Sequence, residues 1–176
     1  MKRTLVAVFL PLTICAIAAA QQDKSQRPSP PASAECKFSD GKTITVDYSS
    51  PRVKGRKIFG DLVPYGQVWR AGANEATTFV TTASLSVEGK EVPAGSYTIF
   101  TVPNQDSWTL IINKHTGEWG VPYKYESEEL ARVPMSVGKT SALVENFTIA
   151  FDQSGNACIL RLSWENTEAS LKFSEK

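Results

Sequence analysis

The sequence predicts an all-β domain, either an antiparallel β-sandwich or a partly closed barrel of seven to eight strands with one short helix. Two observations support this fold class. Segments of alternating, β-branched and aromatic residues recur along the chain, and Gly, Pro, Asn and Asp residues separate them. Only one short segment has a helical pattern, so the strands must cover one another, sheet on sheet.

The expected strands are 42–48, 77–87, 96–102, 108–113, 143–151, 157–164 and 167–173. In the second of these, Phe79, Leu85 and the alternate residues between them share one face. A hairpin turn at 88–90 should follow it, and residues 152–156 should form another turn. The helix is expected at 126–132, where Ser127 could cap it and the glutamates that follow suit the helix dipole.

The first 20 residues predict an export signal. Lys2 and Arg3 give a positive start, and the apolar run 4–20 ends in Ala18–Ala20, which suits signal cleavage. That run is shorter than a membrane span of about 20 residues, so we expect no membrane span. We expect cleavage before Gln21 and a protein that is periplasmic or secreted.

Lipid anchoring at Cys15 is the less favoured alternative, because Ile14 is bulky for the position before a lipidated cysteine. Residues 21–34 are polar and rich in Pro and Ser, which predicts a flexible leader. A single β-sandwich domain should then occupy 35–176, which is long enough to bury one core.

The charge of the chain is close to neutral, with 19 basic and 18 acidic residues. Removing Lys2 and Arg3 with the signal leaves 17 basic residues against 18 acidic ones. A nucleic-acid-binding protein needs a broad basic surface, so we expect no nucleic-acid partner. Cys36 and Cys158 remain after export, and an oxidising compartment favours a disulfide between them over two free buried thiols.

The segment 47–78 contains five basic residues, four aromatic residues and four glycines, and neither a helical nor a strand pattern explains it. Its sequence DYSSPRVKGR, followed by IFG, LVPYG and WRAGANEAT, resembles the bacterial domain of unknown function 2911 family. Pro93–Gly95, Trp108 and Trp119–Gly120 extend the resemblance, and Ala71 departs from it where Thr is usual. The resemblance implies a secreted or periplasmic β-rich domain and no particular activity.

Arg70, Asn74 and Glu75 are the sharpest candidates for a ligand-binding site. The guanidinium of Arg70 suits a carboxylate, phosphate or sulfate, and the amide of Asn74 suits a sugar hydroxyl. Glu75 could accept from hydroxyls or act as a base, and Gly72 would let the backbone approach the ligand. The structural alternative is an Arg70–Glu75 salt bridge that fixes a long loop, with Asn74 holding a turn.

Arg52, Lys54 and Arg56 alternate, so an extended segment would place them on one face. That face could bind an anion or a polyanionic surface. The alternative is a solvated edge strand whose charges prevent aggregation.

Several aromatic residues lie outside the strand patterns: Tyr65, Trp69, Trp119, Tyr123 and Tyr125. Such rings could stack on the face of a sugar, or they could close one end of the sandwich. Trp108 and Trp164 follow strand periodicity and should be core residues.

No sequence motif identifies a reaction. His115 is the only histidine, no Cys-x-x-Cys pair is present, and no phosphate-binding glycine motif occurs, so we expect no metal site and no cofactor. Glu145 could pair with Glu75 or Asp47 as glycosidase carboxylates, and a hydrogen-bonded structural acid is the alternative.

Three hypotheses therefore stay open for the function. The domain could bind a carbohydrate, another glycan or a small anionic envelope ligand in a cationic-aromatic pocket. It could be a metal-independent hydrolase or lyase that uses Glu75 as base and Arg70 to stabilise an anion. It could also be a purely structural envelope protein. The oligomeric state does not follow from the sequence.

Overall fold

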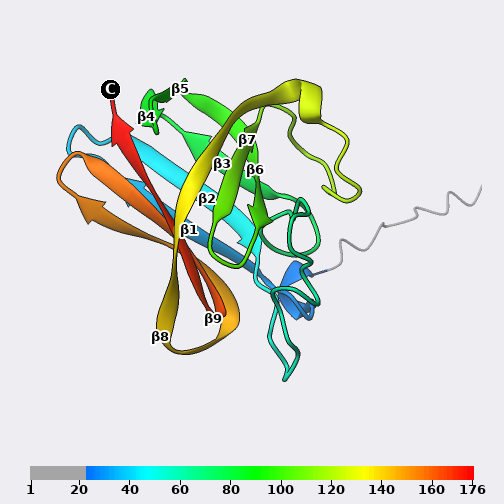
Figure 1. The fold of residues 1–176 in the computed structure, drawn as a ribbon. Helices are drawn as coiled ribbons and strands as arrows, with labels where there is room; N and C mark the ends of the chain where they lie inside the picture. Colours follow the sequence, from blue (N-terminus) through cyan, green and yellow to red (C-terminus); the bar gives the residue numbers. More distant parts are fainter. Residues whose placement is uncertain (1–22) are drawn as a thin grey trace, which may run out of the picture.

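The computed structural model describes residues 23–176, so the export signal predicted at 1–20 lies outside the described residues (Figure 1). These residues form an all-β fold, as predicted, with nine antiparallel strands and two 3₁₀ turns. The strands are β1 Pro31–Lys37, β2 Thr43–Ser49, β3 Thr77–Thr81, β4 Leu85–Val87, β5 Lys90–Val92, β6 Gly95–Pro103, β7 Trp108–Asn113, β8 Glu129–Ser154 and β9 Ala157–Glu175. The turns are η1 Lys24–Gln26 and η2 Glu126–Glu128.

The nine strands form one sheet that folds over onto itself, in the order β1-β2-β3-β6-β7-β8-β9-β4-β5. The long strand β8 makes this possible, because its first part pairs with β7 and the rest pairs with β9 (Figure 1). The two halves of the sheet face each other as the layers of a sandwich. Phe79 of β3 lies 5.3 Å from Phe173 of β9, between ring centroids, and the Tyr48 hydroxyl of β2 accepts from the backbone N–H of Ile149 in β8.

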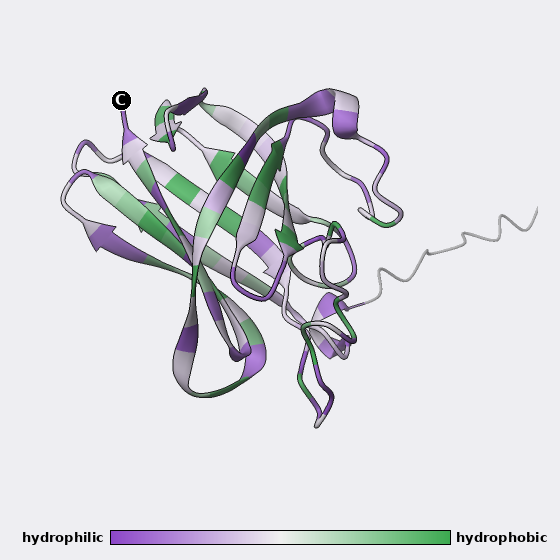
Figure 2. Cartoon of the chain, in the orientation of Figure 1, coloured by the Kyte–Doolittle hydropathy of each residue, from purple (hydrophilic) through white to green (hydrophobic). Residues whose placement is uncertain are grey.

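The core lies between these layers and follows from the alternation of the strands. Hydrophobic and hydrophilic bands alternate along the strands in Figure 2. Phe79, Leu85 and Val87 are buried on the face that the sequence predicts, and Trp108 and Trp164 are core residues as expected. Removal of these apolar side chains from water is the main driving force for the fold.

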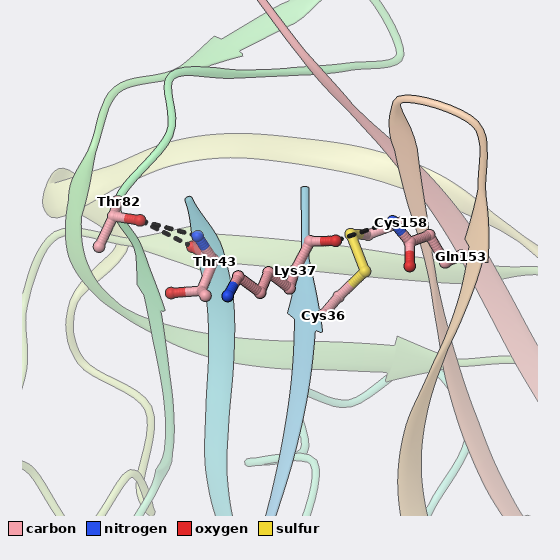
Figure 3. The surroundings of a disulfide bond; sticks show 6 residues. All are labelled: Cys36, Lys37, Thr43, Thr82, Gln153 and Cys158. Atoms are coloured by element: carbon pink, nitrogen blue, oxygen red, sulfur yellow. Dashed lines mark hydrogen bonds between the residues drawn. A yellow bond between two sulfur atoms is a disulfide. The ribbon is translucent and has the colours of Figure 1, made fainter. Parts of the chain in front are cut away.

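The predicted disulfide is confirmed, since Cys36 of β1 is bonded to Cys158 of β9 (Figure 3). It joins a strand at one end of the sheet order to a strand in the facing layer. Gln153 beside it donates to the backbone carbonyl of Lys37 at 2.8 Å. The bridge spans 122 positions in the sequence, for which the chain-entropy model gives a stabilisation of about 4–5 kcal/mol as an upper estimate.

The expected helix at 126–132 is wrong beyond its first turn. Residues 126–128 form η2, and from Glu129 the chain pairs with β7, with Arg132 opposite Ile111. A single helical turn is unstable by itself, and the ladder with β7 satisfies more backbone groups.

Other boundaries also differ from the prediction. The expected strand 77–87 divides into β3 and β4 at a bend, and the two parts pair with different neighbours. β9 joins the two last expected strands into one. β1 begins at Pro31, so the sheet starts before the predicted domain boundary at Glu35 and includes the end of the predicted leader.

Within residues 23–176 no helix is long and apolar enough to cross a membrane.

Candidate functional site

The loop between β2 and β3, residues 50–76, is fixed to the sheet by its backbone. The N–H of Val53 donates to the carbonyl of Glu145 at 2.8 Å, and Trp69 exchanges two backbone hydrogen bonds with Thr101 at 2.7 and 2.8 Å. Three side chains in the middle of the loop are buried: Ile58, Phe59 and Val63. The loop is therefore a built part of the domain, although it has no regular secondary structure.

A pocket of about 450 Å³ opens on this loop, and we call it the basic pocket. Its polar lining includes Arg56, Gln67, Arg70 and Asn74, and its apolar lining includes Leu62, Trp69, Val121 and Trp164. None of the aspartates and glutamates of residues 23–176 lines it. The pocket therefore combines positive charge, amide groups and aromatic faces.

Arg70 is held at the wall of the basic pocket by its own loop and by the loop after β7. Its Nη1 donates to the backbone carbonyls of Asn74 and Trp119, the latter at 2.9 Å, and its Cζ lies 5.6 Å from the Trp119 ring centroid. Burial lowers the pKa of the Arg70 guanidinium, which remains charged at neutral pH. In the described part of the chain it forms no salt bridge.

Arg56 is the second cation of the basic pocket, and it too is held by backbone carbonyls. Its Nε donates to Val53 at 3.1 Å, its Nη2 donates to Arg52, and no carboxylate between residues 23 and 176 pairs with it. Arg56 also lines a shallow adjoining pocket of about 290 Å³ together with Arg52 and Lys54. The three alternating cations thus face one hollow.

The predicted aromatic residues have different surroundings. Trp69 is half-buried and stacks on Trp164, with 5.8 Å between ring centroids. Both residues belong to the lining of the basic pocket. Tyr65 packs over Gly60, where an added Cβ would come within 2.6 Å of its ring. Trp119 is 54% exposed and lies under Arg70 at the edge of the pocket.

A second pocket, of about 310 Å³, lies across the turn 72–76, and we call it the acidic pocket. Asp47, Glu75 and Glu118 line it, together with Lys24. Glu75 lines this pocket and not the basic pocket, although the preceding residue, Asn74, with a positive φ of +58°, lines the basic pocket. The two carboxyl-bearing candidates Glu75 and Asp47 thus line one pocket, and Glu145 instead accepts from the backbone N–H of Lys54.

Glu75 is paired with the N-terminal segment, residues 23–30. Its carboxylate accepts two hydrogen bonds from Arg27, at 2.8 and 3.0 Å, and lies 3.1 Å from Nζ of Lys24. A hydrogen bond from its own backbone N–H, followed by that from Arg27, lowers the pKa of the Glu75 carboxyl to about 2. Such a carboxylate stays ionised at neutral pH and is a weak base.

Asn74 is tied to the same N-terminal segment. Its Nδ2 donates to the backbone carbonyl of Ser29 at 2.9 Å, and Ser29 also lines the basic pocket. Asn74 thus ties the N-terminal segment to the turn 72–76, and it also lines the basic pocket. The predicted Arg70–Glu75 salt bridge is wrong, because Glu75 turns towards Lys24 and Arg27.

Glu118 is a residue that the sequence argument missed. Its side chain is 3% exposed, and neither carboxylate oxygen has a hydrogen-bond partner in residues 23–176. Burial raises the pKa of this carboxyl. His115 lies behind it, with Nε2 3.9 Å from Glu118 and Nδ1 3.2 Å from Glu128. The run His-Thr-Gly-Glu gave no periodic signal, and only the fold brings these groups together.

The structure therefore divides the predicted site. Arg56, Trp69, Arg70 and Asn74 line the basic pocket, whereas Glu75 lines the acidic one. Lys54, Tyr65 and Trp119 lie near the basic pocket without lining it. Over residues 23–176, no three His, Cys, Asp or Glu side chains are arranged to hold a metal ion.

A comparison with protein-family models gives one match, which covers residues 29–173 and carries the description "Protein of unknown function (DUF2911)". No curated protein and no solved structure matches the chain.

Proposed function

Since the chain belongs to the DUF2911 family, for which no function is described, we propose a function from the pocket itself: the domain binds a small anionic ligand, such as a charged carbohydrate, in the basic pocket. We further propose that it does so in the periplasm or outside the cell. The Cys36–Cys158 disulfide supports an oxidising compartment.

The observation that carries this proposal is a pair of arginines that share one pocket and have no acidic partner. Arg56 and Arg70 both line the basic pocket, and each donates only to backbone carbonyls. A guanidinium has five N–H donors, so further donors on each remain for a ligand. Two such groups around one hollow favour a phosphate, sulfate or carboxylate, which can accept paired hydrogen bonds.

The rest of the pocket supports a ligand with a ring. Trp69 offers apolar aromatic surface, and Gln67 and Asn74 offer amide groups that can bind hydroxyls. The volume of about 450 Å³ falls within the range of small-molecule sites, roughly 300–1,000 Å³. Sugar phosphates and uronic acids combine these features.

The alternative of a hydrolase or lyase that uses Glu75 and Arg70 has less support. The two residues line different pockets, and the pKa of about 2 makes Glu75 a weak base. The alternative of a purely structural role has some support, because Arg70 joins two loops through backbone carbonyls. Binding and stability must therefore be measured on the same variants.

The test is a titration of the purified protein with inorganic phosphate, glucose 6-phosphate, glucuronate and neutral glucose, followed by calorimetry and NMR. We expect the charged sugars to bind more tightly than glucose. Arg70→Ala and Arg56→Ala should each weaken binding by at least about thirtyfold, because truncating a charge-pair partner costs roughly 2 kcal/mol or more. Arg161→Ala is the matched control, since Arg161 pairs with Asp152 and Glu168 on β8 and β9.

Equal binding by the Arg70→Ala and Arg161→Ala variants would overturn the assignment of the basic pocket. If none of these anions binds and both pocket variants only lower the unfolding temperature, the structural role is correct. Binding that persists with unchanged affinity when both arginines are replaced would place the ligand elsewhere on the domain.

A further inference from the structure

The exposed apolar side chains of this domain are concentrated at one place. Five large hydrophobic residues of the described chain are exposed: Leu62, Tyr65, Trp119, Val121 and Leu143. The first four lie on the loop between β2 and β3 and on the loop after β7, beside the basic pocket, and we call them the apolar rim. Leu62 and Val121 line the pocket, and Trp119 lies under Arg70. Leu143 is in β8, within the β8–β9 hairpin.

The fold keeps the side chains of the apolar rim exposed to solvent. In the loop between β2 and β3, Phe59 and Val63 are buried in the core while Leu62 is exposed. In the other loop, Gly120 is pressed against the domain, because a Cβ there would lie 2.9 Å from Cβ of Ala76. That contact leaves Trp119 and Val121, on either side of Gly120, half exposed. Exposure at the rim is thus a consequence of ordered contacts beside it.

The two loops approach each other on one side of the sheet. The loop after β7 runs back along the sheet towards the loop between β2 and β3 (Figure 1). The backbone N–H of Ala76 donates to the carbonyl of Glu118 at 3.1 Å, and Arg70 donates to the carbonyl of Trp119. These bonds fix the two halves of the rim relative to each other and to the pocket.

The loop that carries Leu62 and Tyr65 is strongly basic, in a chain that is nearly neutral. Residues 51–70 contain five basic residues, Arg52, Lys54, Arg56, Lys57 and Arg70, against one acidic residue, Asp61. None of the five forms a salt bridge within residues 23–176. Uncompensated basic charge next to exposed Trp, Tyr and aliphatic residues is the combination by which peripheral proteins bind anionic membranes.

We propose that the apolar rim docks on an anionic lipid surface and that the basic pocket then receives a lipid phosphate headgroup. Trp119 and Tyr65 have the amphipathic rings that suit the headgroup region, and Leu62 and Val121 would enter the boundary with the acyl chains. The cations of residues 52–57 would lie against the negative surface. The proposal rests on the proposed function, because it names the source of the anion that the basic pocket binds.

The test is binding to phosphatidylcholine vesicles with and without phosphatidylglycerol, measured by co-sedimentation. We expect binding only with the anionic lipid and a decrease with added salt. The double variant Trp119→Ala with Val121→Ala should bind at least about tenfold more weakly, because it removes apolar surface that would leave water. Leu143→Ala is the matched control and should bind as the unchanged protein does. All variants share the same N-terminal segment, so a difference between them reports on the rim.

A second measurement does not depend on affinity. Trp119 is the most exposed tryptophan, whereas Trp108 and Trp164 are buried. Vesicles brominated near the headgroup should quench part of the tryptophan fluorescence of the unchanged protein and much less in Trp119→Phe. Equal quenching in both proteins would overturn the proposed docking.

Titration of the same proteins with soluble glycerol phosphate separates the two proposals. If glycerol phosphate binds through Arg70 but vesicles do not bind, or if the rim variant binds vesicles as Leu143→Ala does, the docking proposal is wrong and the proposed function stands. If neither glycerol phosphate nor vesicles bind, the docking proposal is wrong, and the titration with the charged sugars decides the proposed function. A loss of vesicle binding in the rim variant that exceeds its loss of affinity for glycerol phosphate is the result that supports docking, and equal losses would overturn it.

Discussion

The basic pocket and the acidic pocket lie on opposite sides of one short turn, residues 72–76, and their charges are satisfied in opposite ways. Arg56 and Arg70 have no acidic partner in residues 23–176 and face an open hollow. Glu75 is held by Arg27 and Lys24. The difference teaches that the sharpest polar cluster in the sequence has two roles: one part fixes the N-terminal segment, and the other part is available to a ligand.

Gly120, between the rim residues Trp119 and Val121, gives the largest expected effect. Gly120 has φ +83°, and a Cβ there would lie 2.9 Å from Cβ of Ala76 and 3.1 Å from the ring of Phe100. Gly120→Ala should therefore lower the free energy of unfolding by about 2–4 kcal/mol, from backbone strain and overpacking together. Urea unfolding measures this decrease in the free energy of unfolding.

The matched control for this variant is Gly117→Ala. Gly117 has nearly the same φ, +81°, but no atom lies within 4 Å of an added Cβ. Strain alone should then cost about 1 kcal/mol. An equal loss of stability in the two variants would mean that the close packing around Gly120 adds nothing to the backbone strain.

The next effect concerns Asn74, which contributes to both sides. Asn74 adopts φ +58° and donates to the carbonyl of Ser29. Asn74→Ala should lower the free energy of unfolding by about 1–2 kcal/mol, because it removes the hydrogen bond and strains the turn. Asn74→Gly loses only the hydrogen bond, so thermal unfolding should show a smaller loss. A larger loss in Asn74→Gly would contradict the role of the backbone conformation.

The sequence predicted the fold well where the strands are regular. The alternation of Phe79, Leu85 and Val87 identified a buried face, and the disulfide followed from two cysteines near the ends of the domain. The prediction from sequence failed where pairing with a strand that is distant along the chain decides the structure. Residues 129–132, Glu-Leu-Ala-Arg, are all good helix formers, but β7 offers them a ladder, and no local pattern reports the presence of that neighbour.

The sequence named candidate residues of both pockets, but it did not predict that they line two separate pockets. Arg70 and Asn74, named as candidates because the segment lacked any periodic explanation, line the basic pocket. Glu75 lines the acidic pocket and pairs with cations from the N-terminal segment, which was expected to be a leader. Glu118 was missed because burial without a partner is a property of the fold and has no sequence signature.

Unlike Glu75, Glu118 of the acidic pocket has no hydrogen-bond partner in the described residues. Its replacement should therefore raise the free energy of unfolding, whereas the other substitutions lower it. A buried carboxylate without a hydrogen-bond partner is costly, so Glu118→Gln should raise the free energy of unfolding by about 1 kcal/mol at neutral pH. Burial raises the folded-state pKa of Glu118 above the ordinary value of 4.5. The contribution of Glu118 to stability is therefore most favourable below that value and is lost as the pH rises through its folded-state pKa.

Urea unfolding as a function of pH checks this prediction. The unchanged protein should lose stability with rising pH relative to Glu118→Gln, and the gap between them should close near pH 4 and below. His115 lies 3.9 Å from Glu118 and 3.2 Å from Glu128, and Asp47, Glu75 and Lys24 line the pocket with Glu118, so both proteins contain the same charged neighbours. A lower stability of Glu118→Gln at neutral pH would show that the carboxylate has a stabilising partner.

The smallest effect belongs to Glu75 and decides what its ion pairs do. Its side chain is 42% exposed, so Glu75→Gln should cost at most about 1 kcal/mol and should leave the affinity of the basic pocket for glucose 6-phosphate unchanged. The folded-state pKa is lowered from 4.5 to about 2, so the stabilisation is present above pH 4.5 and is lost as the pH falls towards 2. Glu91→Gln, which breaks an exposed pair with Lys176 elsewhere, is the control for exposed charge and should leave this acid-dependent loss in place. A thirtyfold loss of affinity for glucose 6-phosphate in Glu75→Gln would mean that the two pockets act as one binding site. No contact of Glu75 within the described residues predicts such a loss.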